Sequence, residues 1–171
     1  IDVGHVSCLT PEGEPVVRYF INVASFGISG NIARRVGRAR IAKFFGDTFA
    51  LGLHSALALL SWRECRVRLM VPQVDGRAAG YDEIAGISTV AIANGQYFGG
   101  GMRVAPNAQP NDGQFDLVIM GGSHKGRLLR DMKAIHSGAH LDNPAVRTLR
   151  SSRLTAAPTI CAGGPVPIET D

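Results

Sequence analysis

One stretch of this 171-residue chain, from Ile92 to Asp116, combines residue types that could hold a ligand or a cation. It begins with an apolar segment, passes through three consecutive glycines at residues 99–101, and ends in an Asn-Asp-Gly turn at residues 111–113. Glycine-rich loops let the backbone approach a ligand closely, and some of them bind phosphate. Neither GxGxxG nor GxxxxGK[ST] occurs here, so the residues alone favour a structural turn over a nucleotide loop.

The turn also carries a carboxylate, that of Asp112. A carboxylate in a tight turn can bind a hard cation together with nearby carbonyl oxygens, which are the ligands that magnesium prefers. An aspartate in such a turn can instead accept a hydrogen bond from the backbone two residues later. Residue chemistry alone favours this second use.

The apolar pattern indicates which elements must position these residues. Alternating or continuous apolar runs predict a β-hairpin and several further strands, at residues 2–9 with 16–23, 64–71, 84–94, 115–120, 146–156, 159–162 and 166–169. Helical spacing predicts helices at residues 29–36, 41–62 and 125–136. Strands outnumber helices without a regular β-α-β rhythm, which favours a mainly β fold with inserted helices. We expect a two-layer antiparallel β-sandwich, one domain over residues 1–171 with a helical insertion at about 29–62.

Composition and charge narrow the class of protein. The chain is 45% hydrophobic and 19% charged, enough to bury a core, and its net charge of +4 does not select a partner. The three cysteines Cys8, Cys65 and Cys161 are odd in number, far apart and without CxxC spacing. They indicate neither a disulfide framework nor a zinc site, so we expect a reducing cytoplasm.

The two ends of the chain and its longest apolar stretch bear on its context. The chain opens at Ile1 without an initiator methionine and closes at Asp171, which we interpret as an excised fragment. The longest apolar stretch, residues 49–60, is shorter than the roughly 20 helical residues that span a bilayer. A transmembrane protein is therefore not expected.

Three blocks of sequence together resemble a known family. They are Phe20-Ile21-Asn22-Val23-Ala24-Ser25-Phe26-Gly27, the run from Asn94 to Asp116, and Ile168-Glu169-Thr170-Asp171. In order and spacing, across essentially the whole chain, they resemble the C-terminal half of bacterial diacylglycerol and phosphatidylglycerol kinases, which are related to sphingosine and ceramide kinases. The central block, from Asn94 to Asp116, is the most specific part of this resemblance. Three consecutive glycines alone would not indicate the family.

The resemblance implies a division of labour between two domains. An N-terminal domain with a Gly-Gly-Asp-Gly-Thr motif, absent from this chain, would bind ATP, and this chain would be the lipid-side β-sandwich domain. It also implies a structural magnesium ion held by the Asp112 carboxylate and the carbonyls of Gln109 and Gln114. Asp171 would be the first acidic residue of the catalytic motif, whose proton-accepting glutamate would lie two residues beyond it.

The expected insertion contains an apolar set that could line or cover a lipid site, namely Phe44, Phe45, Phe49, Leu53 and Leu57. Packing of the same side chains on the sheet is an equal alternative. A basic cluster precedes them, formed by Arg34, Arg35, Arg38, Arg40 and Lys43. Such a cluster suits docking on an anionic membrane surface, at about 1 kcal/mol per charge, or is simply a solvated helix face.

The acceptor has one sequence clue. Sphingosine kinases resemble this chain near Ser25 but carry an aspartate where Asn31 stands, so a neutral acceptor such as diacylglycerol is favoured over an amino lipid. We therefore expect an ATP- and magnesium-dependent lipid kinase, cytoplasmic and peripheral to the inner face of the membrane, inactive as a fragment, with no nucleic-acid partner. The alternatives are a non-catalytic lipid-binding module of the same fold and a kinase for sphingoid or ceramide lipids. A cleft face exposed without the N-terminal domain could also produce a homodimer.

Overall fold

The computed structural model describes residues 1–30, 65–72, 80–98, 101–121, 133–161 and 166–171. Nine antiparallel strands form two sheets within these residues. Most of the expected insertion, residues 31–62, lies outside them, as do residues 125–132 of the last expected helix. Residues 28–30 and 133–134 are helical, and a short 3-10 helix, η1, covers Ala139–Asp142.

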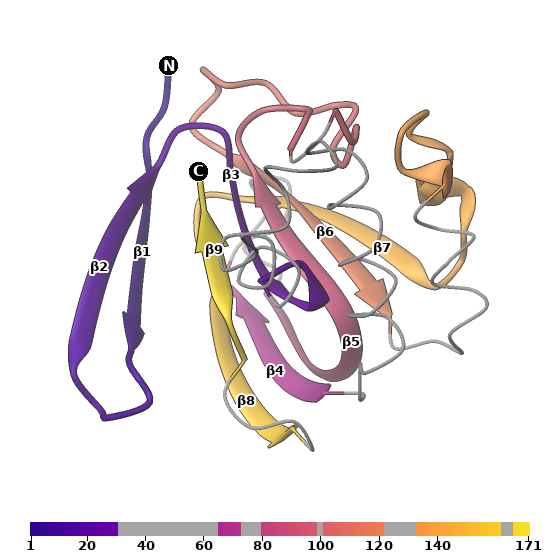
Figure 1. The fold of residues 1–171 in the computed structure, drawn as a ribbon. Coiled ribbons are helices and arrows are strands. Elements are labelled where there is room, and N and C mark those ends of the chain that lie inside the picture. Colours follow the sequence, from indigo (N-terminus) through magenta and orange to yellow (C-terminus); the bar gives the residue numbers. More distant parts are fainter. Residues whose placement is uncertain (31–64, 73–79, 99–100, 122–132, 162–165) are drawn as a thin grey trace, which may run out of the picture.

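The smaller sheet is the predicted hairpin, β1 (Gly4–Leu9) with β2 (Pro15–Phe20). Figure 1 shows it beside the main sheet rather than within it. The second strand was expected to continue to residue 23, but it ends at Phe20, and β3 (Val23–Gly27) begins after a bend. β3 is a separate strand of the main sheet, and no strand was expected at residues 24–27.

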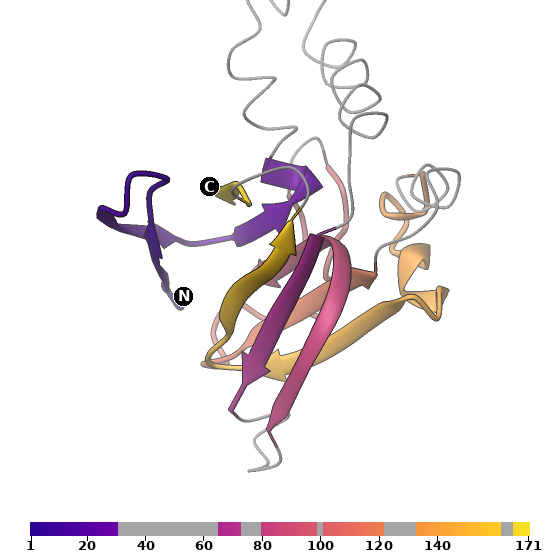
Figure 2. The same ribbon diagram turned by 90° about the horizontal axis from the view of Figure 1, so that it is seen from below.

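The main sheet is organised around its longest strand, β5 (Tyr81–Ala93). The second half of β5 pairs with β6 (Phe115–Gly121) on one edge and with β3 on the other, and its first half pairs with β4 (Cys65–Val71). Outer strands complete the sheet: β7 (Val146–Ser151) beside β6, β8 (Thr155–Cys161) beside β4, and β9 (Ile168–Thr170) beside β3. In Figure 2, β4 and β8 extend downward from the part of the sheet that contains β3 and β9.

Both faces of the central strands are buried. Ala91, Ala93 and Val118 belong to one apolar cluster, and their neighbours Val90 and Ile119 belong to a second. A strand buried on both faces reads as a continuous apolar run rather than an alternating one. The mainly β, antiparallel, sandwich-like architecture expected from the sequence is confirmed.

The expectation about the last strands was wrong. The expected strand at 146–156 is interrupted at residues 152–154, and Pro158 lies inside β8. Within the described residues β8 pairs only with β4, and an edge strand tolerates a proline because one side needs no hydrogen-bond donors.

Cys65 and Cys161 form a disulfide, which the sequence analysis did not expect. They lie opposite each other across β4 and β8 with their Cα atoms 4.3 Å apart, although 96 residues separate them in sequence. Only the strand register reveals the pairing. The cysteine count therefore gives no argument for a reducing compartment.

Gly27 offers a test of how tightly β3 packs on β5. Its φ is +106°, and a Cβ there would lie 2.4 Å from the Ser88 carbonyl oxygen. We expect Gly27→Ala to lower the free energy of unfolding by about 3 kcal/mol, combining backbone strain with overpacking. Gly13→Ala is the control, since its φ is +89° but no atom lies within 4 Å of the added carbon; it should lose about 1–2 kcal/mol. Equal losses in urea unfolding would contradict close β3–β5 packing.

Candidate functional site

The three sequence blocks meet at Asn22, in the bend between β2 and β3. The Asn22 backbone N–H donates a hydrogen bond of 2.8 Å to Oδ2 of Asp171, which follows β9. The Asn22 carbonyl oxygen accepts the backbone N–H groups of Asn94 and Gly95, at 2.8 and 2.9 Å. The backbone of Asn22 thus joins residues 94–95 and 171, which are far apart in sequence. We call this set of contacts the Asn22 junction.

The Asn22 side chain reinforces this junction. Its Nδ2 donates to the carbonyl oxygen of Tyr97 at 2.6 Å. A Cβ on Gly95 would lie 2.1 Å from Asn22 Oδ1, so the backbone at residue 95 can approach Asn22 only because it carries no side chain. Asp171 itself is exposed, which leaves its carboxylate accessible at the end of β9.

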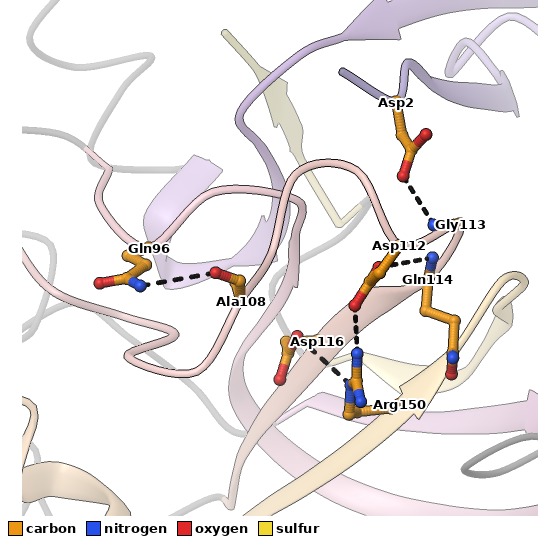
Figure 3. Close-up of polar contacts among 8 residues, drawn as sticks. All are labelled: Asp2, Gln96, Ala108, Asp112, Gly113, Gln114, Asp116 and Arg150. Carbon is orange, nitrogen blue, oxygen red and sulfur yellow. Dashed lines mark hydrogen bonds and ion pairs between the residues drawn. The ribbon is translucent and has the colours of Figure 1, made fainter.

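A cation lies next to this junction, on the loop that follows β5. The Arg103 guanidinium is 5.9 Å from the centre of the Tyr97 ring, and its Nη2 donates to Gln96 Oε1 at 3.2 Å. Gln96 in turn donates to the Ala108 carbonyl oxygen at 3.5 Å (Figure 3). The buried Nε of Arg103 has no hydrogen-bond partner among the described residues. A guanidinium fixed in this way can bind an anionic group such as phosphate.

A second carboxyl, that of Glu169, lies on β9 two residues before Asp171, and pairs across the strands with Ser25 of β3. Burial raises the pKa of the Glu169 carboxyl, and the neighbouring Ser25 hydroxyl opposes part of that rise. The Ser25 and Ser29 hydroxyls are buried, with no hydrogen bond of good geometry to the described residues. The Glu169 carboxyl is therefore partly withdrawn from water and lies beside buried hydroxyl groups.

Two of the predicted metal ligands, Asp112 and Gln114, lie at the turn before β6, as Figure 3 shows. Oδ1 of Asp112 accepts the backbone N–H of Gln114 at 2.9 Å, which is the turn-stabilising use that residue chemistry favoured. Oδ2 of Asp112 forms an ion pair with Nη2 of Arg150 on β7. Gln109 is exposed. Both Asp112 oxygens thus already have N–H partners, and the positive guanidinium beside Oδ2 opposes the approach of a second cation such as magnesium.

The metal assignment of Asp112, Gln109 and Gln114 stays a prediction, and no group of three or more histidine, cysteine or acidic side chains able to hold a metal occurs in the described part of the chain. The turn is also tied to the Asn22 junction through Asp2. The Gly113 N–H donates to Asp2 Oδ2 at 2.7 Å, and Asn94 Nδ2 donates to the Asp2 carbonyl oxygen at 2.9 Å.

The predicted lipid-binding residues Phe44, Phe45, Phe49, Leu53 and Leu57 lie outside the described residues, as do Asn31 and the basic cluster. Among the described residues, no helix has both the length and the apolar character needed to cross a bilayer. Asn22 and Arg103 lie within the blocks that carry the family resemblance, but no role was expected for either of them. Glu169 and Arg150 were not expected to be functional either, since their partners become apparent only from strand register.

The pKa of Glu169 predicts a pH dependence of stability. Burial raises the pKa of the Glu169 carboxyl in the folded state, so protonation of this carboxyl favours folding. This contribution is fully present below the pKa of the unfolded state, 4.5, and is lost as pH rises through the pKa of the folded state. We expect Glu169→Gln to match wild type near about pH 4 and to exceed its melting temperature at about pH 7.5.

Glu83→Gln is the control for that experiment, because the pKa of Glu83 is shifted in the opposite direction. Hydrogen bonds from Arg147 and Tyr81 lower the pKa of Glu83, so its contribution is present at neutral pH and is lost in acid. That variant should be no more stable than wild type at neutral pH. A Glu169→Gln variant that melts below wild type at neutral pH would show that the ionised carboxylate is stabilising instead.

Comparison with known proteins gives consistent matches. Residues 22–171 match the family model of the YegS C-terminal NAD kinase beta sandwich-like domain. Two curated proteins named diacylglycerol kinase, from Mycobacterium tuberculosis strains CDC 1551 / Oshkosh and ATCC 25618 / H37Rv, are each 28% identical over 127 residues. The match covers 65% of this chain but 41% of each relative, so the chain spans less than half of their length.

A solved structure shares the fold. It is a crystal structure of a protein assigned as a diacylglycerol kinase, from Bacillus anthracis str. Sterne, with a TM-score of 0.52 at 17% identity. The superposition covers 99% of this chain and 50% of that one. Since the family model covers all but the first 21 residues, this chain belongs to the family of YegS C-terminal, NAD kinase-like β-sandwich domains.

Proposed function

We propose that this chain is the lipid-side domain of a kinase that transfers the γ-phosphoryl group of ATP to the hydroxyl of diacylglycerol or a related lipid. The observation that carries the proposal is the convergence at Asn22 of the three blocks that resemble lipid kinases, with the Asp171 carboxylate exposed beside them. The relatives named diacylglycerol kinase support the kinase class. ATP binding is assigned to a domain outside this chain, consistent with the part of the relatives that the chain does not cover.

In this proposal the residues around Asn22 orient the reacting groups. The Asn22 N–H holds Asp171 Oδ2, which fixes the direction of that carboxylate at the end of β9. The Arg103 guanidinium, held by Gln96 and the Tyr97 ring, offsets negative charge on the phosphoryl oxygens. The lipid hydroxyl oxygen forms the new bond to the γ-phosphorus as the bond to the β-phosphate oxygen breaks. Its proton passes to a carboxylate of the acidic motif that begins at Asp171.

Magnesium bound with ATP would neutralise charge on the phosphates. No step of the proposal uses an ion at Asp112, because the contacts there do not fit one. The lipid chains are assigned to the region of Phe44 to Leu57, and the acceptor to a neutral lipid on the basis of Asn31. A peripheral position on the inner face of the membrane, and self-association through a cleft face that is exposed without the ATP-binding domain, belong to the same proposal.

The direct test is transfer of radiolabelled phosphate from MgATP to a panel of diacylglycerol, phosphatidylglycerol, ceramide and sphingosine. We expect the full-length protein to label diacylglycerol and this chain alone to label none. Labelled ceramide or sphingosine instead would show that the acceptor is a sphingoid or ceramide lipid. No labelled lipid, combined with tight binding to diacylglycerol-containing vesicles, would favour a non-catalytic lipid-binding module.

The same assay tests the role of Asp171. Asp171→Asn keeps the size of the side chain but removes its charge, so we expect kcat to fall by roughly 100-fold or more, with KM changed little. Asp142→Asn is the control, since Asp142 is an exposed carboxylate on η1 outside the Asn22 junction. Similar kcat values for Asp171→Asn and wild type would remove Asp171 from the catalytic centre.

A further inference from the structure

Arg150 occupies the place beside Asp112 where a bound cation would be expected. It lies on β7 directly opposite Asp116 of β6, so the two side chains share one face of the sheet. Its Nη2 forms an ion pair with Asp112 Oδ2, and its Nε is 3.8 Å from Asp116 Oδ2 (Figure 3). The Asp112 and Asp116 side chains are only 18% and 12% exposed, so water screens their charges weakly and a nearby positive charge is needed.

Three further hydrogen bonds hold the turn. The Gln114 N–H bonds Asp112 Oδ1, and the Gly113 N–H bonds the carboxylate of Asp2. The backbone N–H of Asp2 donates back to the Pro110 carbonyl oxygen at 2.7 Å. A divalent ion at Asp112 would have to displace the guanidinium and would then lie beside it, with like charges in contact.

We propose that Arg150 is the resident cation of the turn formed by residues 110–116, so that this chain holds the turn without a divalent ion. The guanidinium replaces the ion both electrostatically and mechanically. It links the turn before β6 to the neighbouring strand β7, as a metal bridging two segments would. This inference concerns the fold of the turn and does not depend on kinase activity.

The test is local hydrogen–deuterium exchange of the peptide that covers residues 110–116, measured on the full-length protein. Two amides in this peptide, those of Gly113 and Gln114, report on the carboxylate contacts directly. We expect wild-type exchange to be the same in EDTA and in millimolar magnesium. A clear slowing by magnesium in the wild type would overturn the proposal, because it would show that an ion holds the turn.

Substitutions separate the guanidinium from a general loss of structure. Arg150→Met should speed exchange of this peptide in EDTA by roughly tenfold. Magnesium should slow exchange more in this variant than in wild type, because Asp112 and Asp116 then lack their guanidinium. Exchange in EDTA that matches wild type would refute the role of Arg150.

Two further variants control this result. Arg147→Met lies on the same strand and removes an exposed ion pair with Glu83, so it should leave the peptide unchanged. Arg150→Lys keeps a positive charge and should stay insensitive to magnesium, even if Arg150→Met fails to fold. Sensitivity of the lysine variant equal to that of Arg150→Met would show that charge at this position does not replace the ion.

Discussion

The rest of the site depends on the backbone of Asn22. Its N–H donates to the Asp171 carboxylate, and its carbonyl oxygen accepts two N–H groups from the segment after β5. Asn94 is fully buried, so moving the segment after β5 would leave its backbone N–H without a partner. The bend between β2 and β3 therefore sets the position of the loop after β5, and it also holds Asp171 at the end of β9 through an exposed hydrogen bond.

The chain reaches this arrangement by leaving the hairpin sheet at residue 21 and entering the main sheet at Val23. Asn94 stabilises the crossing, since its buried side chain donates to the carbonyl oxygens of Ile21 and Asp2. Asp2 then continues the network to the turn at residues 110–113. A polar network that joins four segments fixes their relative positions more closely than apolar packing alone, because each hydrogen bond is directional.

Much of the fold could be predicted from the sequence because strand periodicity is local. The hairpin, β4 and β6 follow from apolar patterns of a few residues. β3 was missed because all five of its residues are buried and it begins only three residues after β2 ends, which reads as one continuous apolar segment. The Cys65–Cys161 disulfide and the pairing of Arg150 with Asp112 depend on strand register between distant segments, and no local pattern encodes register. Asp171 could be singled out only through resemblance to a family, and its contact with Asn22 only from the structure.

The central claim is that the three blocks joined at Asn22 form one side of a phosphoryl-transfer centre. The most direct measurement is a crystal structure of the full-length protein with a non-hydrolysable ATP analogue. The claim predicts a γ-phosphate within hydrogen-bond reach of Arg103, with the Asp171 carboxylate facing it across the space of one water or hydroxyl group. A γ-phosphate bound away from the Asn22 junction, with Asp171 and Arg103 facing only solvent, would contradict it.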